Sequence, residues 1–202
     1  MHFRPSSLAG LLTAIVVLGL GGCATEVTRI ETDEVRDLSG AWNDTDSQLV
    51  SQEMINQMLD GRWLPEYQAR TGTKPTVIVG EVRNLSHEHI NVNTFIADIE
   101  RAVINSGRVT FVASSTERLG VRDERKDQDV HAREDTRKPM GQEIGADFML
   151  GGTMSTIIDR AGADQVRYYQ IDLTLISLAD NTKVWVGQKK IKKFVERSQL
   201  RY

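Results

Sequence analysis

The fold is decided by the stretch GADFMLGGTMSTIID, residues 145–159, which predicts one long β-strand. Aliphatic and β-branched side chains dominate it, and such residues fit the pleated, half-buried surface of a sheet. The pair Gly151-Gly152 permits a bulge or the close approach of a neighbouring backbone. The pair is not a phosphate-binding loop, because no Lys-Ser or Lys-Thr follows it and no helix begins there. We therefore expect a sheet to which this strand contributes.

Two further strands are predicted after it, over residues 166–177 and 183–194, with turns at 161–164 and 179–181. Alternation along the first of them defines two faces. The apolar face carries Tyr169, Ile171, Leu173 and Leu175. The polar face carries Tyr168, Gln170, Asp172 and Thr174. We expect the apolar face to pack on helices and the polar face to meet water or a partner.

The last strand combines an apolar face, shared by Trp185 and Ile191, with a local group of basic side chains. These are Lys189, Lys190, Lys192 and Lys193, in a chain whose net charge is -3. Such lysines either protect an edge strand from aggregation or contact a partner. The candidate partner-binding residues are Tyr168, Gln170 and Lys190.

Two helices are predicted near the start of the domain, before the first strand. A helix over residues 46–60 is predicted to start at a capping box of Thr45 and Gln48 and to end at Gly61. A short second helix is expected to begin at Pro65.

A strand–helix–strand pattern follows over residues 76–113. Its strands are predicted at 76–82 and 108–113, and its helix is capped by Asn93 or Thr94. The helix carries an apolar face of Ile96, Ile99, Val103 and Ile104. Because the connections are short, this forms one right-handed unit if the two strands are parallel.

The composition then shifts to mixed charges over residues 114–138, which indicates a solvated, loosely docked helix. A short helix is predicted at 139–145, with Met140 and Ile144 pointing inward.

The loop motif His87-Glu88-His89 suggests a metal site, because imidazole is a common ligand for zinc or copper. The signal is weak, since no third ligand stands at a supporting spacing. The alternative is a loop whose side chains hydrogen-bond the start of the next helix. No serine lies in a Gly-x-Ser-x-Gly elbow, and Glu88 does not have the spacing of a helical zinc motif. We predict no metal, no cofactor and no enzymatic activity.

The N-terminus has the pattern of a lipoprotein signal peptide over residues 1–22. A basic start with Arg4 precedes an apolar run at 8–20, which is too short to span a bilayer. The run ends in Leu20-Gly21-Gly22-Cys23, which resembles a bacterial lipobox. We expect cleavage before Cys23 and acylation of its thiol, since several acyl chains make a lasting anchor. Ala24 follows the cysteine, and in the usual sorting rule this directs a lipoprotein to the outer membrane, facing the periplasm.

The rest of the chain is predicted to be a short tether at 23–38, including the lipidated cysteine, and one domain at 39–202. Cys23 is the only cysteine, so the domain is expected to have no disulfide. The net charge of -3 argues against a protein that covers nucleic acid.

Six stretches of the chain form a pattern together: LSGAWNDTDS at 38–47, EHIN at 88–91, FIADIERA at 95–102, GADFMLGG at 145–152, YQIDL at 169–173 and KVWVG at 183–187. Together they resemble the LpoB family of outer-membrane lipoproteins, which activate penicillin-binding proteins. The resemblance implies an α/β (α+β) domain similar to the amino-terminal domain of TolB, in which helices pack about a mainly antiparallel sheet. One departure is the tether, because well-studied members have a long proline-rich one and this whole chain has four prolines.

The role implied by the resemblance is non-enzymatic. The lipoprotein would dock on a small accessory domain of a class A penicillin-binding protein and stimulate its transpeptidase and glycosyltransferase activities. The alternative is a structural or assembly lipoprotein of the cell envelope, since relatives of this fold serve in secretion and appendage assembly.

Overall fold

The computed structural model describes residues 26–196, in two units that divide between Glu34 and Val35. Cys23 and the predicted signal peptide lie outside the described residues. The described part of the first unit, residues 26–34, is exposed and contains one turn, in which the Glu34 N–H donates to the Glu31 carbonyl at 3.2 Å. Across residues 26–196, none of the helices is long and apolar enough to cross a membrane.

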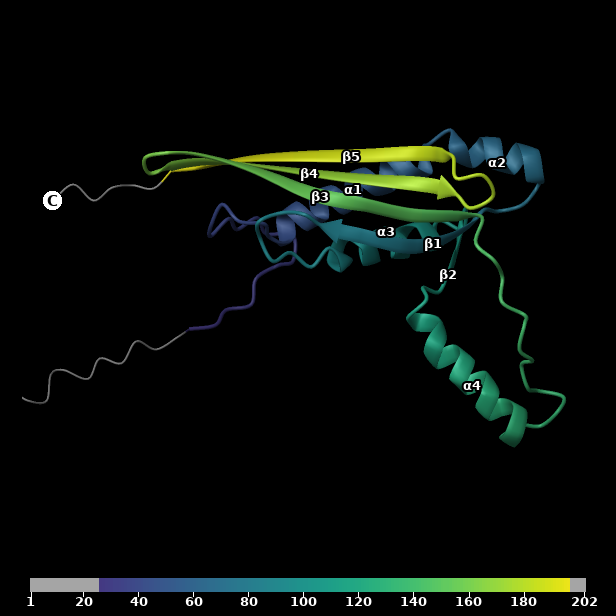
Figure 1. The fold of residues 1–202 in the computed structure, drawn as a ribbon. Coiled ribbons are helices and arrows are strands. Elements are labelled where there is room, and N and C mark those ends of the chain that lie inside the picture. Colours follow the sequence, from purple (N-terminus) through teal and green to yellow (C-terminus); the bar gives the residue numbers. More distant parts are fainter. Residues whose placement is uncertain (1–25, 197–202) are drawn as a thin grey trace, which may run out of the picture. The chain divides into compact units, whose positions relative to one another are not determined.

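The second unit is built on one five-stranded sheet in the order β2-β1-β3-β4-β5 (Figure 1). Its strands are β1 (Thr76–Asn84), β2 (Thr110–Val112), β3 (Phe148–Ala161), β4 (Asp164–Ser177) and β5 (Lys183–Val195). The pairs that β1 makes with β2 and β3 are parallel, and the much longer pairs β3–β4 and β4–β5 are antiparallel. The predicted α+β class is confirmed, as are the strands expected at 166–177 and 183–194.

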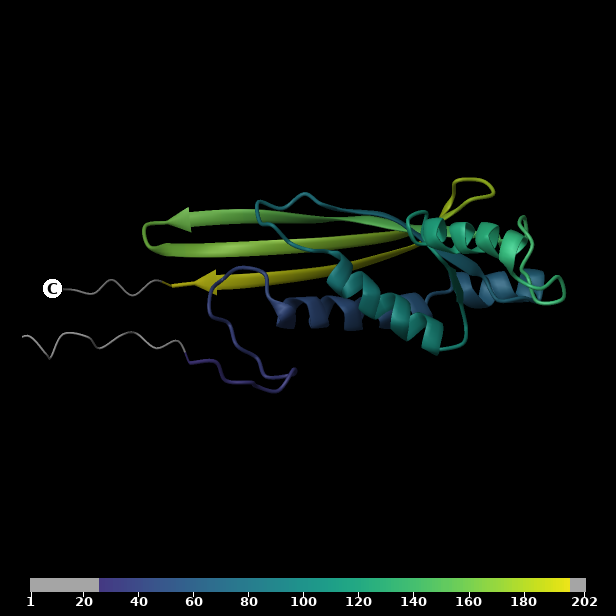
Figure 2. The same ribbon diagram turned by 90° about the horizontal axis from the view of Figure 1, so that it is seen from below.

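Four helices accompany the sheet, and two of them cover one of its faces. They are α1 (Asp44–Leu59), α2 (Trp63–Thr71), α3 (Asn93–Asn105) and α4 (Glu117–His131). Figure 2 shows α1 and α3 lying across this face. The fully buried side chains between these layers include Val50, Met54, Met58, Phe95, Ile99, Leu150, Met154, Tyr169, Ile171, Leu173 and Leu175. The apolar face predicted for β4 is therefore the core face.

Helix α1 begins two residues earlier than predicted, at a different capping box. The Asn43 side chain accepts the Asp46 N–H at 3.0 Å, and the Asp46 carboxylate accepts the Asn43 N–H at 3.0 Å. Asn is among the strongest N-cap residues and ranks above Thr, which gives the physical reason for the shift. The box of Thr45 and Gln48 was wrong.

Helix α3 differs from the prediction at its N-cap and at one residue of its apolar face. Its N-cap is Val92, which caps without its side chain, and the Asn91 side chain accepts the Asn93 N–H at 3.1 Å. Phe95 joins Ile96, Ile99 and Val103 in the core, whereas Ile104 is half-exposed. Ile104 follows Val103 by one residue, which turns it about 100° around the helix and off the buried face.

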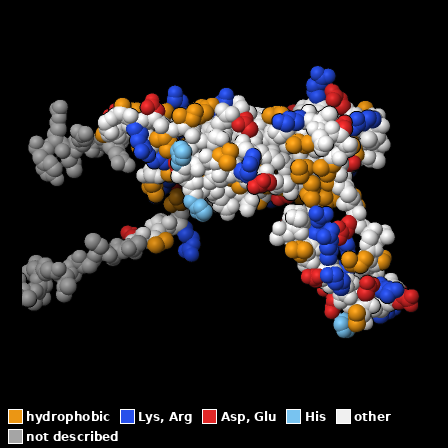
Figure 3. All heavy atoms as spheres, viewed as in Figure 1, with side chains coloured by type: hydrophobic (Ala, Val, Ile, Leu, Met, Phe, Trp, Pro, Cys, Tyr) orange, Lys and Arg blue, Asp and Glu red, His pale blue; other side chains and the backbone are white. Residues whose placement is uncertain are grey.

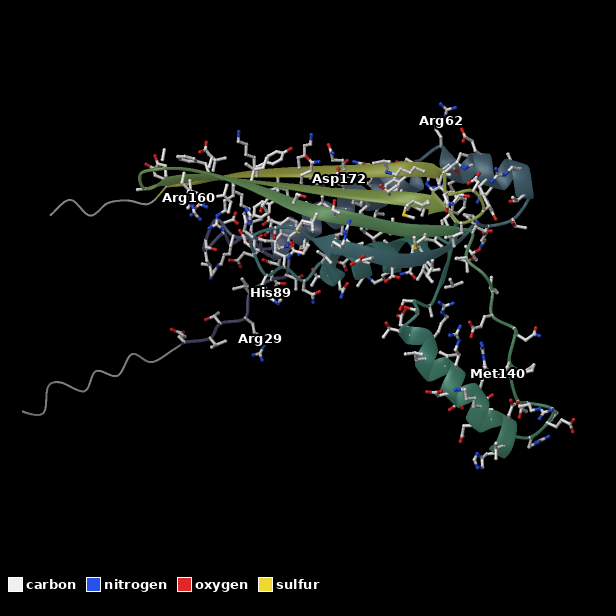
Figure 4. All side chains as sticks on the ribbon, in the orientation of Figure 1. Arg29, Arg62, His89, Met140, Arg160 and Asp172 are labelled. Atoms are coloured by element: carbon white, nitrogen blue, oxygen red, sulfur yellow. The ribbon has the colours of Figure 1, made fainter. Side chains whose placement is uncertain are left out.

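The solvated helix is confirmed as α4, because none of its residues is buried. The short helix predicted at 139–145 was wrong, since these residues form an irregular segment. Met140 is 44% exposed and Ile144 is 66% exposed, so neither points into the core. The physical reason is that the segment returns from α4 to β3 alongside the helix, where Figure 4 shows Met140. We call α4 and residues 132–146 the arm.

Candidate functional site

The face of the sheet opposite α1 and α3, here called the open face, is left bare by these helices (Figures 1 and 2). Along β4 the alternate residues Tyr168, Gln170, Asp172 and Thr174 lie on it and are half-buried. Figure 4 shows Asp172 on this side. The prediction that these four side chains share a face is confirmed.

One end of the open face, near the β3–β4 turn, gathers aromatic, aliphatic and basic side chains. Ile157 stands beside Tyr168 on one side, and Lys192 stands beside it on the other. Lys190 pairs with Gln170 in the same register. Ile157 is 66% exposed and Phe194 is 64% exposed. We call this group the distal patch; it consists of Ile157, Tyr168, Gln170, Lys190, Lys192 and Phe194.

The three predicted residues Tyr168, Gln170 and Lys190 are thus brought together, and sequence reasoning missed Ile157 and Phe194. A signal for Phe194 was present, because it has the same parity along β5 as Lys190. Ile157 could be added only from the pairing of β3 with β4, which the sequence does not give.

A row of hydrogen bonds fixes the polar side chains of the open face. The Tyr168 hydroxyl donates to Gln170 Oε1 at 3.3 Å, and Gln170 Nε2 donates to Asp172 Oδ2 at 2.7 Å. The Gln188 amide of β5 donates to the other oxygen of Asp172. Side chains held in place before binding lose less entropy when a partner docks, so this row favours recognition.

The sequence predicted one basic cluster on β5, but the structure divides its four lysines between the two faces of the sheet. Alternation sends Lys190 and Lys192 to the open face and Lys189 and Lys193 to the helix face. Lys193 Nζ lies 2.6 Å from a carboxylate oxygen of the buried Asp46 and 3.0 Å from Asp37. Strand β5 is an edge of the sheet, as the interpretation of edge protection requires.

The loop motif His87-Glu88-His89 supplies a structural carboxylate. Glu88 Oε1 accepts hydrogen bonds from the Tyr169 hydroxyl and from Arg167 Nη1, both at 2.7 Å. Glu88 Oε2 accepts the Trp42 N–H at 2.9 Å. The expectation that this loop serves the next helix is therefore wrong for Glu88, which joins β4 to the segment before α1.

Burial raises the pKa of the Tyr169 phenol, and the neighbouring Glu88 carboxylate raises it further. The phenol is therefore held as a hydrogen-bond donor. Within residues 26–196, no group of three His, Cys, Asp or Glu side chains is placed to hold a metal ion.

Comparison with known families adds a match to the fold. The model of a family described as peptidoglycan-synthase activator LpoB matches residues 46–191. This stretch reaches from α1 into β5; it includes β1 to β4 and the first nine residues of β5. The chain belongs to the LpoB family.

Solved structures of the LpoB C-terminal domain are among those similar to this chain. The domain from Salmonella enterica is 16% identical, with 75% of this chain and 99% of that chain covered and a TM-score of 0.37. The domain from Escherichia coli is 16% identical, with 65% and 99% covered and a TM-score of 0.36. The lipoprotein GNA1162 from Neisseria meningitidis is 16% identical, with 62% and 88% covered and a TM-score of 0.38. No curated protein sequence matches the chain.

Membership of the LpoB family gives the chain the general role of a peptidoglycan-synthase activator. The likeness to the TolB amino-terminal domain stays a prediction.

Proposed function

We propose that this chain is an outer-membrane lipoprotein that binds and stimulates a class A penicillin-binding protein, and so regulates peptidoglycan synthesis. The observation that carries the proposal is the LpoB family match over residues 46–191, which spans most of the folded unit. The chain acts by binding and catalyses no reaction itself.

The distal patch is the proposed contact surface. Tyr168 and Phe194 are aromatic side chains on a bare sheet, and aromatic side chains are enriched among the residues that dominate binding energy. Lys190 and Lys192 border them, so the patch is locally basic although the chain has a net charge of -3. An aromatic centre with a charged rim is typical of a protein interface.

Stimulation by binding requires that the synthase has more than one state. The lipoprotein raises the rate only if the patch binds the active state more tightly than the inactive one. A tenfold shift in that equilibrium corresponds to about 1.4 kcal/mol of differential binding. One or two contacts made only in the active state therefore suffice.

We expect the double variant Tyr168→Ala with Phe194→Ser to bind its synthase roughly 30-fold more weakly, which corresponds to about 2 kcal/mol for loss of aromatic anchors. The measurement is the Kd of the full-length lipoprotein in detergent for each class A penicillin-binding protein of the same organism, with glycan polymerisation and cross-linking followed in parallel. Val186→Ser is the matched control, since Val186 is an exposed apolar residue on the same strand and face but outside the patch.

Two results would count against these assignments. Equal weakening by Val186→Ser would mean that the contact is not confined to the distal patch. If the unaltered protein binds and stimulates no synthase, the regulator proposal is wrong and the structural or assembly lipoprotein takes its place.

The anchor has its own test at Cys23. We expect Cys23→Ser to move the protein from the outer-membrane fraction to the soluble periplasmic fraction, because serine cannot form the thioether to diacylglycerol. The measurement is immunoblotting of separated fractions, with Ser39→Ala as the control. A Cys23→Ser protein that stays in the outer membrane would remove the lipid-anchor proposal.

A further inference from the structure

Helix α4 of the arm is not stabilised by burial of its own side chains. Helix α4 has 15 residues, none of them buried, and an isolated helix of this length is marginal in water. Large apolar side chains are exposed along this helix, namely those of Leu119, Val121 and Val130. A helix of this kind normally gains its stability by packing an apolar face against something.

Three arginines on α4 converge on a single carboxylate. Arg118, Arg122 and Arg125 are spaced four and three residues apart, which places them on one face of the helix. Arg122 Nε and Nη2 donate to both oxygens of Glu143 at 2.9 and 2.8 Å. Arg125 Nη1 lies 3.2 Å and Arg118 Nη1 3.8 Å from the same carboxylate. Figure 3 shows basic side chains gathered along the arm.

The charges of this cluster do not balance. One carboxylate faces three guanidinium groups, so two positive charges are in excess. The hydrogen bond from Arg122, with the charges of its neighbours, lowers the pKa of Glu143. Arg118 Nε is buried and has no hydrogen-bond partner among the described residues.

A groove of about 280 Å³ lies beside the arginines. Its apolar lining is formed by Val112, Ala113, Val121 and Ile144. Its polar lining is formed by Arg118, Arg125, Gln142 and Glu143. A lining that combines apolar side chains with two arginines complements a segment that carries both an apolar side chain and carboxylates.

We propose that this groove is a second docking site, which takes an acidic segment of the partner synthase. An aliphatic or aromatic side chain of that segment enters between Val121 and Ile144, and flanking Asp or Glu carboxylates bind Arg118 and Arg125. The planar guanidinium group is suited to a carboxylate, and Glu143 already shows that geometry on Arg122. This inference rests on the proposed function, since it assigns a further contact to the same partner.

The two docking sites lie at opposite ends of the sheet. The distal patch is next to the β3–β4 turn, and the arm joins the sheet at β2 and at the start of β3 (Figure 1). A partner held at one site has a high effective concentration at the other, so two modest contacts give a tight complex. Loss of the arm contact should therefore weaken the complex without abolishing it.

The first test compares two double variants of the full-length lipoprotein. Arg118→Ala with Arg125→Ala is expected to raise the Kd for the synthase at least tenfold and to make it less dependent on salt. Lys126→Ala with Lys138→Ala removes the same charge from exposed positions of the same arm, outside the groove, and is expected to change the Kd less than twofold. Equal Kd values for the two double variants would overturn the inference.

The second test leaves the arginines intact, so that a loosened arm cannot mimic the result. A photo-crosslinking amino acid placed at Val121 is expected to react with an Asp- or Glu-rich peptide of the synthase, identified by mass spectrometry. Crosslinks to a second copy of this chain, or to lipid alone, would overturn the inference. If the distal-patch variant weakens binding and both arm tests fail, the proposed function is supported and the second docking site is wrong. If the unaltered protein binds no synthase, the proposed function and the second docking site are both wrong.

Discussion

Replacement of Glu88 by glutamine is expected to destabilise the second unit by roughly 3 kcal/mol, because it removes one partner of a largely buried ion pair. The side chains of Glu88 and Arg167 are 19% and 18% exposed, so Arg167 would be left with little water to solvate its charge. The Tyr169 hydroxyl and the Trp42 N–H share the same carboxylate, and one amide oxygen cannot accept all of these hydrogen bonds.

Urea and thermal unfolding measure this effect. A loss of this size lowers the Tm by about 6–12 °C for a domain of this length. Glu81→Gln is the matched control, because Glu81 is an exposed glutamate on β1, and its expected change is within about 0.5 kcal/mol. Adding Arg167→Met to Glu88→Gln should recover part of the loss, since no buried charge then stays unpaired. Wild-type stability of Glu88→Gln would contradict this account of the cluster.

The features of the fold that sequence predicted well are those with a local cause. The alternation of β4 is a property of neighbouring residues, and it separated Tyr168 from Tyr169 before any pairing was known. The strand at 148–161 was visible for the same reason. The boundaries of α1 and α3 were less accurate, because several Asn, Asp and Thr residues stand close enough to compete as caps.

The features that sequence missed depend on contacts between distant residues. The motif His87-Glu88-His89 suggested a metal site because of its histidines, whereas its carboxylate makes the structural contacts. Glu88 lies 79 positions before Arg167, so their contact could not be predicted from neighbouring residues. Met140 and Ile144 have the periodicity of a buried helix, but the segment they belong to is an irregular part of the exposed arm. For the candidate site, alternation gave Tyr168 and Gln170, whereas Ile157 required the register of β3 against β4.

A second large effect is expected at Gly152, in the middle strand β3. A Cβ atom added there would overlap the carbonyl oxygen of Asp172, and would lie 2.7 Å from Leu173 Cδ2 and 3.1 Å from Leu173 Cα. Two of these three atoms are backbone, and β3 is held between β1 and β4, so neither strand can move away cheaply. We expect Gly152→Ala to lower the free energy of unfolding by about 3 kcal/mol, the upper end of the usual cost of overpacking.

The control for this prediction is a Gly→Ala substitution at a position where the added Cβ meets no neighbouring atom. Gly120 lies within α4 with no atom near its added Cβ, so Gly120→Ala should favour the helix by up to about 1 kcal/mol. Opposite signs for the two variants in urea unfolding would show that the close approach at Gly152 sets the cost, whereas a stable Gly152→Ala protein would contradict it. The contact also concerns the open face, because the atom that must shift is the carbonyl of Asp172, whose side chain anchors the hydrogen bonds to Gln170 and Gln188. Folded Gly152→Ala protein is therefore expected to bind its synthase more weakly than Gly120→Ala protein, although neither glycine offers a side chain to a partner.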